Sequence, residues 1–282
     1  MSDRTINPKI QEERIYREDG NMAEIPDYEV YAVRYATRAA RSNEHFHGHD
    51  PHDAPMPMDY FVWAVVSEEH TIVIDVGFSA EVAARRGRHH LRCPTEGLRE
   101  LGIDSEAVPL VILTHLHYDH IGNLEKFPAA TFVVQEEEMK FWTGRYAGRP
   151  HFREIVETED VLHLVRENFA GRLRFVAGSE EIAPGIEVHL TGGHSHGLQV
   201  VRVKTVRGSV VLASDATHFY ENIEQDRPFS IVADLAQMYG AFDLVRSLAD
   251  SPGHVVAGHD PLVMERFPPA REELEDMAVR IA

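Results

Sequence analysis

The stretch THLHYDHIGN, residues 114–123, places three histidines and one aspartate within six consecutive positions. Neutral imidazole and carboxylate groups are together the ligands of borderline divalent metals such as zinc. An accidental cluster of solvated histidines is the alternative. The other histidines and aspartates of the chain, and the elements that carry them, decide between these two interpretations.

The apolar run VPLVILT (108–114) directly precedes the cluster and predicts a buried strand. On an extended backbone, His115 and His117 lie two residues apart and point to the same side. Asp119 and His120 follow at the point where the chain turns away. His115 and His117 therefore point to one position, and Asp119 and His120 point to a second position nearby. This arrangement predicts a site for two metal ions.

Three more polar residues follow apolar strands elsewhere in the chain. His194 lies in LTGGHSHG, Asp215 in LASDATH and His259 in VAGHDP. A catalytic zinc ion takes about three protein ligands and keeps one position open, so one motif cannot complete two ligand shells. A lone histidine at a strand end is usually structural, but the joint occurrence of these residues favours a metal centre.

Runs of β-branched and aromatic residues between turn residues predict a series of strands. We expect strands at 28–36, 59–67, 71–77, 108–114, 130–135, 173–178, 185–192, 198–205, 208–215 and 254–260, and helices at 95–102, 136–143, 158–170, 233–249 and 269–281. The strands come in two runs, each followed by helices. This order predicts an α/β fold with two facing sheets and helices outside, a four-layer αββα sandwich. We expect a polar arm over 1–25 and a single domain over 26–282.

The order of these motifs resembles the metallo-β-lactamase superfamily. SDATHFYENIE, AGHDP and the strand MPMDYFVW make the N-acyl-homoserine lactonase group the nearest in appearance. The resemblance implies the four-layer fold and a role for each site residue. His115, His117 and His194 would hold one metal ion, Asp119, His120 and His259 would hold the other, Asp215 would bridge them, and Asp75 in TIVIDVG would support the site without binding metal.

Two metal ions about 3.5–4 Å apart can share a water and lower its pKa to about 7, so that hydroxide is available to attack a carbonyl carbon. Asp119, His218 and Tyr220 are the catalytic candidates. In the lactonases a tyrosine follows the bridging aspartate by three residues, whereas here His218 takes that position and Tyr220 is the nearest tyrosine. We expect His218 to donate a proton or a hydrogen bond, with a purely supporting histidine as the alternative.

The segment RSNEHFHGHDPHDAPMPM (41–58) contains four further histidines, at 45, 47, 49 and 52. Its length and lack of periodicity are typical of a lid or binding loop. We expect a lid that sets substrate specificity rather than a third metal site.

Composition restricts the partners. The net charge of −18 and the lack of a basic stripe argue against nucleic acid and polyanionic substrates. A single cysteine, a charged N-terminal stretch and the lack of a long apolar run predict a cytoplasmic protein without a membrane segment. We expect a small-molecule substrate, a neutral lactone or ester, and a homodimer is compatible with the sequence.

These observations predict a dinuclear zinc hydrolase that opens a lactone or a related cyclic ester. One alternative is a thioesterase resembling glyoxalase II, although that group usually carries a C-terminal domain and about 20 residues follow His259 here. A second is a redox enzyme resembling the persulfide dioxygenases, which use a single iron. A non-catalytic binding module is disfavoured because every ligand position is filled.

Overall fold

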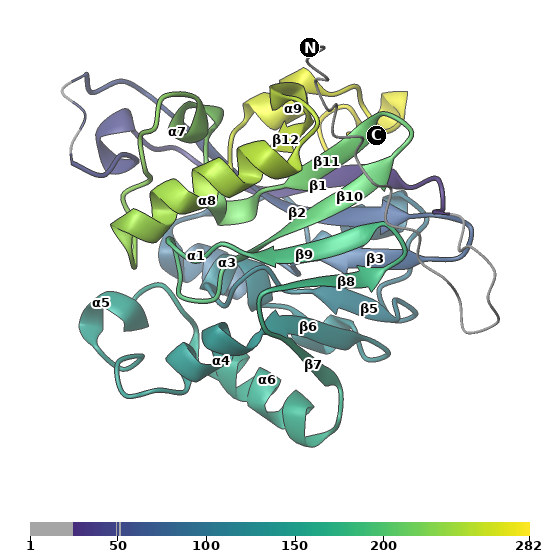
Figure 1. Ribbon diagram of the computed structural model, residues 1–282, viewed down its shortest axis with the longest axis horizontal. Coiled ribbons are helices and arrows are strands. Elements are labelled where there is room, and N and C mark those ends of the chain that lie inside the picture. Colours follow the sequence, from purple (N-terminus) through teal and green to yellow (C-terminus); the bar gives the residue numbers. More distant parts are fainter. Residues whose placement is uncertain (1–24, 49, 51) are drawn as a thin grey trace, which may run out of the picture.

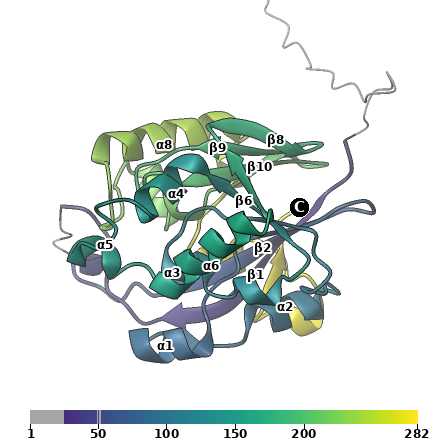
Figure 2. The ribbon, with the colours of Figure 1, turned by 90° about the horizontal axis from the view of Figure 1, so that it is seen from below.

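The computed structural model describes residues 25–282 except 49 and 51. The polar arm expected over 1–25 therefore lies almost wholly outside the described residues. Two β-sheets pack face to face, and helices cover their outer faces (Figure 1). Figure 2 shows α8 on one side of the paired sheets and α1 and α2 on the other. The expected four-layer α/β sandwich is confirmed.

The first sheet has the strand order β13–β1–β2–β3–β5–β6–β7, and β4 pairs with β1. Its strands are β1 (Glu29–Arg38), β2 (Met58–Val66), β3 (Thr71–Ile74), β4 (His89–His90), β5 (Leu110–Ile112), β6 (Thr131–Gln135), β7 (Leu173–Val176) and β13 (Ala278–Arg280). β3, β5 and β6 are parallel neighbours. Their carboxyl ends therefore lie along one edge of the sheet.

The second sheet has the strand order β12–β11–β10–β9–β8. Its strands are β8 (Ser179–Ala183), β9 (Ile186–Leu190), β10 (Gln199–Thr205), β11 (Gly208–Leu212) and β12 (Val255–Val256). β9 and β11 both run antiparallel to β10, and β12 runs parallel to β11. β9, β11 and β12 thus end on the same side.

Apolar side chains fill the three interfaces between the four layers. Trp63 and Ile112 of the first sheet pack with Val201 and Leu212 of the second sheet, and all four are fully buried. Burying one such side chain stabilises the fold by about 1.5–3 kcal/mol. Separate clusters join the first sheet to its helices and the second sheet to α8. The two sheets are therefore held rigidly enough to position side chains at their shared edge.

The helices are short. They are α1 (Ala80–Arg86), α2 (Pro94–Glu100), α3 (Tyr118–Ile121), α4 (Glu136–Trp142), α5 (Pro150–Arg153), α6 (Thr158–Phe169), α7 (Tyr220–Glu224), α8 (Leu235–Leu248) and α9 (Leu262–Arg266), with single 3-10 turns at 42–44, 124–126, 214–216, 252–254 and 272–274. Within the described part of the chain, none has both the length and the apolar character needed to cross a membrane.

One expected element is wrong. The helix predicted over 269–281 is replaced by a 3-10 turn and by β13, which pairs antiparallel with β1. The apolar spacing of this segment fits a helix, but the edge of β1 offers unpaired backbone groups that a strand can satisfy. His89 and His90 also pair with β1, as the short strand β4.

Candidate metal centre

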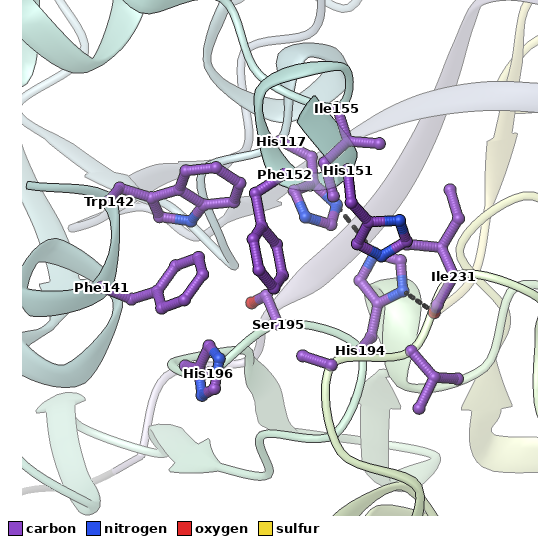
Figure 3. Close-up of a pocket in the computed structure, with 12 residues that line it drawn as sticks. His117, Phe141, Trp142, His151, Phe152, Ile155, His194, Ser195, His196 and Ile231 are labelled. Carbon is purple, nitrogen blue, oxygen red and sulfur yellow. Dashed lines mark hydrogen bonds between the residues drawn. The ribbon is translucent and has the colours of Figure 1, made fainter. Parts of the chain in front are cut away.

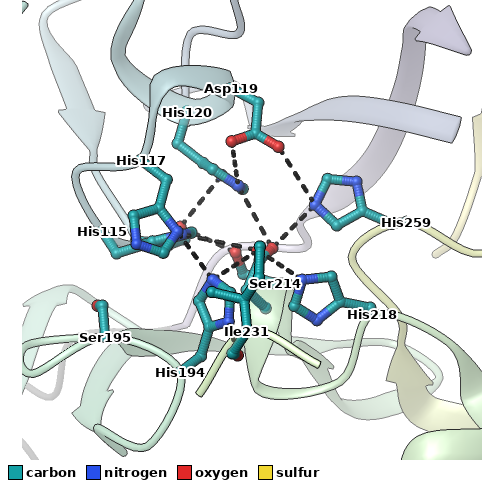
Figure 4. A network of polar contacts seen from close by, with 12 residues as sticks. His115, His117, Asp119, His120, His194, Ser195, Ser214, His218, Ile231 and His259 are labelled. Atoms are coloured by element: carbon teal, nitrogen blue, oxygen red, sulfur yellow. Dashed lines mark hydrogen bonds and ion pairs between the residues drawn. The ribbon is translucent and has the colours of Figure 1, made fainter. Parts of the chain in front are cut away.

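Seven of the histidines and carboxylates singled out in the sequence meet at the shared edge of the two sheets. His115, His117, Asp119 and His120 follow β5, His194 follows β9, Asp215 follows β11 and His259 follows β12. All seven are at most 8% exposed. The parallel direction of these strands is what brings their ends together. Figure 4 shows the six of these side chains that it labels turned toward one centre.

Asp215 occupies the middle of the cluster. Its Oδ2 lies 3.1 Å from Nε2 of His194 and 3.6 Å from Nε2 of His115. Its Oδ1 lies 3.0 Å from Nε2 of His259 and 3.3 Å from Nε2 of His120. The two carboxylate oxygens therefore face two different sets of donors.

The donors form two principal groups that could each hold an ion. One comprises His115, His117, His194 and Asp215, and the other comprises Asp119, His120 and His259. Within the first, Nδ1 of His117 lies 2.8 Å from Nε2 of His194. Within the second, the Asp119 oxygens lie 3.8 Å from Nε2 of both His120 and His259.

The outward nitrogens of the imidazoles are held by the protein. Nδ1 of His120 contacts Asp75 Oδ2 at 2.7 Å, and Nδ1 of His259 contacts the Asp59 carbonyl at 2.8 Å. Nδ1 of His194 contacts the Ile231 carbonyl at 2.8 Å. Such partners fix the tautomer and ring direction of metal-binding histidines. The inward nitrogens are consequently presented to the centre.

The ionisation of the cluster suits metal binding. Burial holds the pKa of His115 and of His117 well below its ordinary value, so both rings are neutral, as a ligand must be. Burial alone would raise the pKa of Asp215, but the surrounding imidazoles, His218 and His259 foremost, hold it well below its usual range. His120 and His259 differ, because burial lowers their pKa values but the neighbouring carboxylates, Asp215 foremost, raise them above the ordinary value. Metal binding at these two rings would therefore release protons.

Unusual backbone conformations support the site. Asp75 has φ +58° and Ser214 has φ +45°, both in the left-handed region that few non-glycine residues adopt. Asp75 accepts hydrogen bonds from the backbone and the hydroxyl of Thr114, both at 2.7 Å. A side chain at Gly258 would meet the Ser214 carbonyl oxygen at 2.5 Å, so the approach of the His259 loop requires glycine. Strain of this kind is typical of functional sites.

Glu138 is a supporting residue that the sequence analysis missed. This fully buried carboxylate accepts hydrogen bonds from the backbone of Leu116 at 3.0 Å and of Gly197 at 2.6 Å. It also accepts from Ser195 at 2.8 Å and from the Trp142 indole at 2.7 Å. Glu138 therefore ties the His115–His117 loop to the His194 turn. Its place inside the run EEE gave no signal, because acidic runs usually lie in solvent.

His218 lies inside the cluster rather than beside it. Its Nε2 is 3.0 Å from Asp215 Oδ2, and with Asp215 and His259 it forms a third group of potential ligands. The ring stacks on Phe229 with centroids 3.6 Å apart and planes 8° apart. Burial lowers the pKa of His218 to about 3. The ring is therefore neutral near pH 7, which favours a hydrogen-bond donor over an acid.

Tyr220 is not brought to the centre. It lies at the start of α7 with its ring under the Arg266 guanidinium, 3.6 Å from the ring centroid. It lines neither of the cavities that reach the histidine cluster. Tyr220 lies two residues beyond His218, where the chain turns into α7, and its side chain packs against Arg266 instead of the cluster.

The 41–58 segment places its histidines in different environments. His45 is fully buried, stacks against Phe229 and contacts the Met56 carbonyl at 2.8 Å through Nε2. His47 and His52 are exposed, and His49 lies outside the described residues. None of these described histidines lines a cavity at the centre.

Two cavities reach the cluster. One of about 210 Å³ is lined by His117, Asp119, His194, Asp215 and His218, together with residues of β1, β2 and the segment after α1. A second, narrow cavity of about 10 Å³ lies beside His117 and His194. Figure 3 shows Phe141, Trp142 and Phe152 around it, so this second cavity is largely apolar.

Residues 56–259 match the metallo-beta-lactamase superfamily, and the chain belongs to this family. The N-acyl homoserine lactonase AiiA of Bacillus thuringiensis subsp. kurstaki is 30% identical over 134 residues, 47% of this chain and 48% of that protein. The chain thus spans about half the length of the first curated relatives it matches. AttM, an N-acyl homoserine lactonase of Azorhizobium caulinodans, is 27% identical over 234 residues, 74% of this chain and 84% of that protein.

Solved structures agree with the fold. An N-acyl homoserine lactone hydrolase with the product N-hexanoyl-L-homoserine at its catalytic metal centre has a TM-score of 0.71 at 20% identity, over 87% of this chain and 98% of that one. The dizinc quorum-quenching lactonase AidC has a TM-score of 0.67 at 17% identity, over 85% of this chain and 90% of that one. At these identities the likeness shows the fold.

Proposed function

We propose that this protein is a metal-dependent hydrolase with two zinc ions that opens a small lactone or a related ester. The observation that carries the proposal is the position of Asp215, whose Oδ2 faces His194 and His115 while its Oδ1 faces His259 and His120. A carboxylate so placed is suited to bridge two ions. The lactonase names of the relatives support the choice of substrate class.

The donor chemistry fits such ions. His115, His117 and His194 would hold one, and Asp119, His120 and His259 would hold the other, with Asp215 between them. Within the described residues, the buried Nε2 atoms of His115 and His120 have no hydrogen-bond partner. Leaving such atoms buried and unpaired is costly, and one ion in each group of donors would satisfy them. Nitrogen and oxygen donors without a thiolate suit zinc and neighbouring divalent metals.

Bound zinc ions would supply a water of lowered pKa and would polarise the substrate carbonyl. The residues of the chain hold and orient the reacting groups. His218, neutral and fixed by its stack on Phe229, would donate a hydrogen bond to the oxygen that gains negative charge. Asp119 lines the larger cavity and is the most exposed donor at 8%, so it is placed to accept a proton from water.

Metal analysis and turnover on the same preparation test the proposal. Protein purified without added metal should contain about two zinc ions per chain and should hydrolyse simple lactones faster than thioesters or β-lactams. A single tightly held iron would instead support the persulfide dioxygenase alternative, and a preference for thioesters would support the glyoxalase II alternative. Sedimentation of this preparation would test the homodimer.

A further inference from the structure

The larger cavity is lined by three arginines and by three acidic residues, Asp119, Glu154 and Asp215. Its volume is about 210 Å³, below the roughly 300–1,000 Å³ of pockets that take drug-sized ligands. Besides the cluster residues, its lining includes Arg38, Arg86 and Arg88. The cavity thus suits a small molecule, and three guanidinium groups lie around it.

Two of these arginines are neutralised by carboxylates of the protein. Nε of Arg86 donates to Glu157 at 2.8 Å, and its Nη1 donates to the Glu154 carbonyl at 2.7 Å. Arg38 forms an ion pair with Glu44. The guanidinium groups of Arg86 and Arg38 therefore do not require an anion from a bound ligand.

Arg88 differs from both. Its Nε donates to the Tyr118 hydroxyl at 3.1 Å and its Nη1 donates to the Arg86 carbonyl at 2.8 Å. Among residues 25–282, apart from 49 and 51, no carboxylate lies within 4.0 Å of its guanidinium nitrogens, and Nη2 has no hydrogen-bond acceptor. Two neutral acceptors thus hold the guanidinium, which has no direct ion pair with a described carboxylate.

The local fold fixes this position. Gly87 ends α1 in the left-handed conformation with φ +64°, and the Arg88 backbone N–H donates to the Ala83 carbonyl at 2.8 Å. This pattern closes the helix and turns the chain into β4. Arg88 therefore leaves a rigid turn rather than a mobile loop.

The guanidinium remains charged although it is half-buried. Burial lowers the pKa of Arg88, but Tyr118, Tyr60 and Asp119 together raise it above its ordinary value. The cation is thus stable in its place, and its guanidinium N–H groups that have no protein acceptor are directed donors for an anion. Because Arg88 and the candidate metal centre line the same cavity, a molecule that brings an anion to Arg88 would also lie beside that centre.

We propose that Arg88 binds a carboxylate carried by the substrate, so that this enzyme acts on a small lactone or ester bearing a negative charge. This inference rests on the proposed hydrolase function and departs from the neutral substrate that the net charge suggested. The carboxylate would sit on Nη2 of Arg88 while the scissile carbonyl lies at the metal centre. Arg88 is then a specificity-determining residue.

The first test compares two γ-lactones that differ only in one group, a ring carboxylate or its methyl ester. The wild-type enzyme should prefer the carboxylate in kcat/KM, and Arg88→Met should lower that preference about 10- to 100-fold, mainly through KM. Arg88→Lys, which keeps the charge and loses the planar fork, should fall between. Arg85→Met is the matched control, because Arg85 lies on α1 three residues before Arg88, is half-exposed and does not line the cavity. This variant should keep the full preference.

The second test measures binding of cyclopentanecarboxylate, which has no bond to cleave, by calorimetry on wild-type and variant proteins of equal metal content. Affinity should fall 10- to 100-fold in Arg88→Met and stay unchanged in Arg85→Met. Two results would overturn the inference and leave the hydrolase proposal standing. One is a wild-type enzyme that opens the lactone ring of the methyl ester as fast as that of the carboxylate compound. The other is equal binding of cyclopentanecarboxylate by Arg88→Met and Arg85→Met. Arg88-dependent binding without any lactone turnover would refute the hydrolase proposal instead. If Arg88→Met does not fold, the preference of the wild-type enzyme for the carboxylate lactone and its reduction in Arg88→Lys still test the inference.

Discussion

Two stretches of this chain are rich in histidine and use it in opposite ways. The motif at 115–120 buries its three imidazoles and directs ring nitrogens to a shared centre, whereas the 41–58 segment buries one ring among aromatic side chains and exposes two. The difference lies in what surrounds the rings. The motif directly follows the buried strand β5 and has a carboxylate, Asp75, behind His120, whereas the buried His45 of the segment contacts the Met56 carbonyl of the same segment. Histidine density alone is therefore a weak signal, and a strand end with a partner behind the ring is a strong one.

The largest effect should come from removing the anion between the two donor groups. Asp215→Ala should reduce turnover by more than about 10³-fold and release at least one metal ion, because both groups lose their common carboxylate. Steady-state kinetics and elemental analysis would measure this. Asp243→Ala, at an exposed carboxylate on α8, is the control. Retention of two metal ions and near-normal turnover in Asp215→Ala would show that Asp215 is not the bridge.

The meeting of the candidate ligands at one edge could be predicted because each follows a strand whose apolar pattern is clear. The strand ends of 108–114, 208–215 and 254–260 all lie at the edge where the cluster forms. The residues behind the ligands could not be predicted in the same way. Glu138 and Arg88 act through contacts with segments far away in the sequence, and neither has a distinctive local pattern. The segment 269–281 shows the same limit, since the open edge of β1 outweighed its helical spacing.

The next largest effect should come from His218, which lies in the cluster but departs from the lactonase pattern. His218→Phe keeps the stack on Phe229 and removes both nitrogens, so kcat should fall about 10²-fold while the metal content stays at two ions. Kinetics and metal analysis of the same sample would separate two roles. Loss of a metal ion would identify His218 as a ligand, and an unchanged kcat would leave it a supporting residue.

The contact between Asp75 and His120 can be weakened without changing His120 itself. Asp75→Asn keeps a residue that tolerates φ +58° but removes the charge behind His120, so metal affinity should fall about 10- to 100-fold. Competition with a chelator would measure the affinity, and excess zinc should restore turnover. Asp226→Asn is a matched control, because Asp226 is an exposed aspartate with φ +50°. Equal affinities in both variants would remove the supporting role of Asp75.

His45 should affect stability rather than chemistry. Burial lowers the pKa of His45, so the folded protein holds it neutral, and its contribution to stability is present above pH about 6.5 and lost as the pH falls. His45→Phe should cost about 1 kcal/mol at pH 7 through the lost contact with Met56, and should lose less stability than the wild type between about pH 7 and pH 5. Urea unfolding of both proteins at the two pH values would measure this. Identical pH dependence would mean that His45 is not held neutral.

The smallest effect is expected from the remaining histidines of the 41–58 segment. His47 and His52 are exposed, and substitutions at such positions usually change free energies by no more than about 0.5 kcal/mol. Replacing His47, His49 and His52 together with glutamine should therefore leave two metal ions bound and kcat within about twofold. If the segment acts as a lid, only KM should rise, because a lid changes how substrate is held and not how the bond is cleaved. Loss of metal in this triple variant would contradict the contrast between the two regions, since these histidines would then be ligands that no strand end positions.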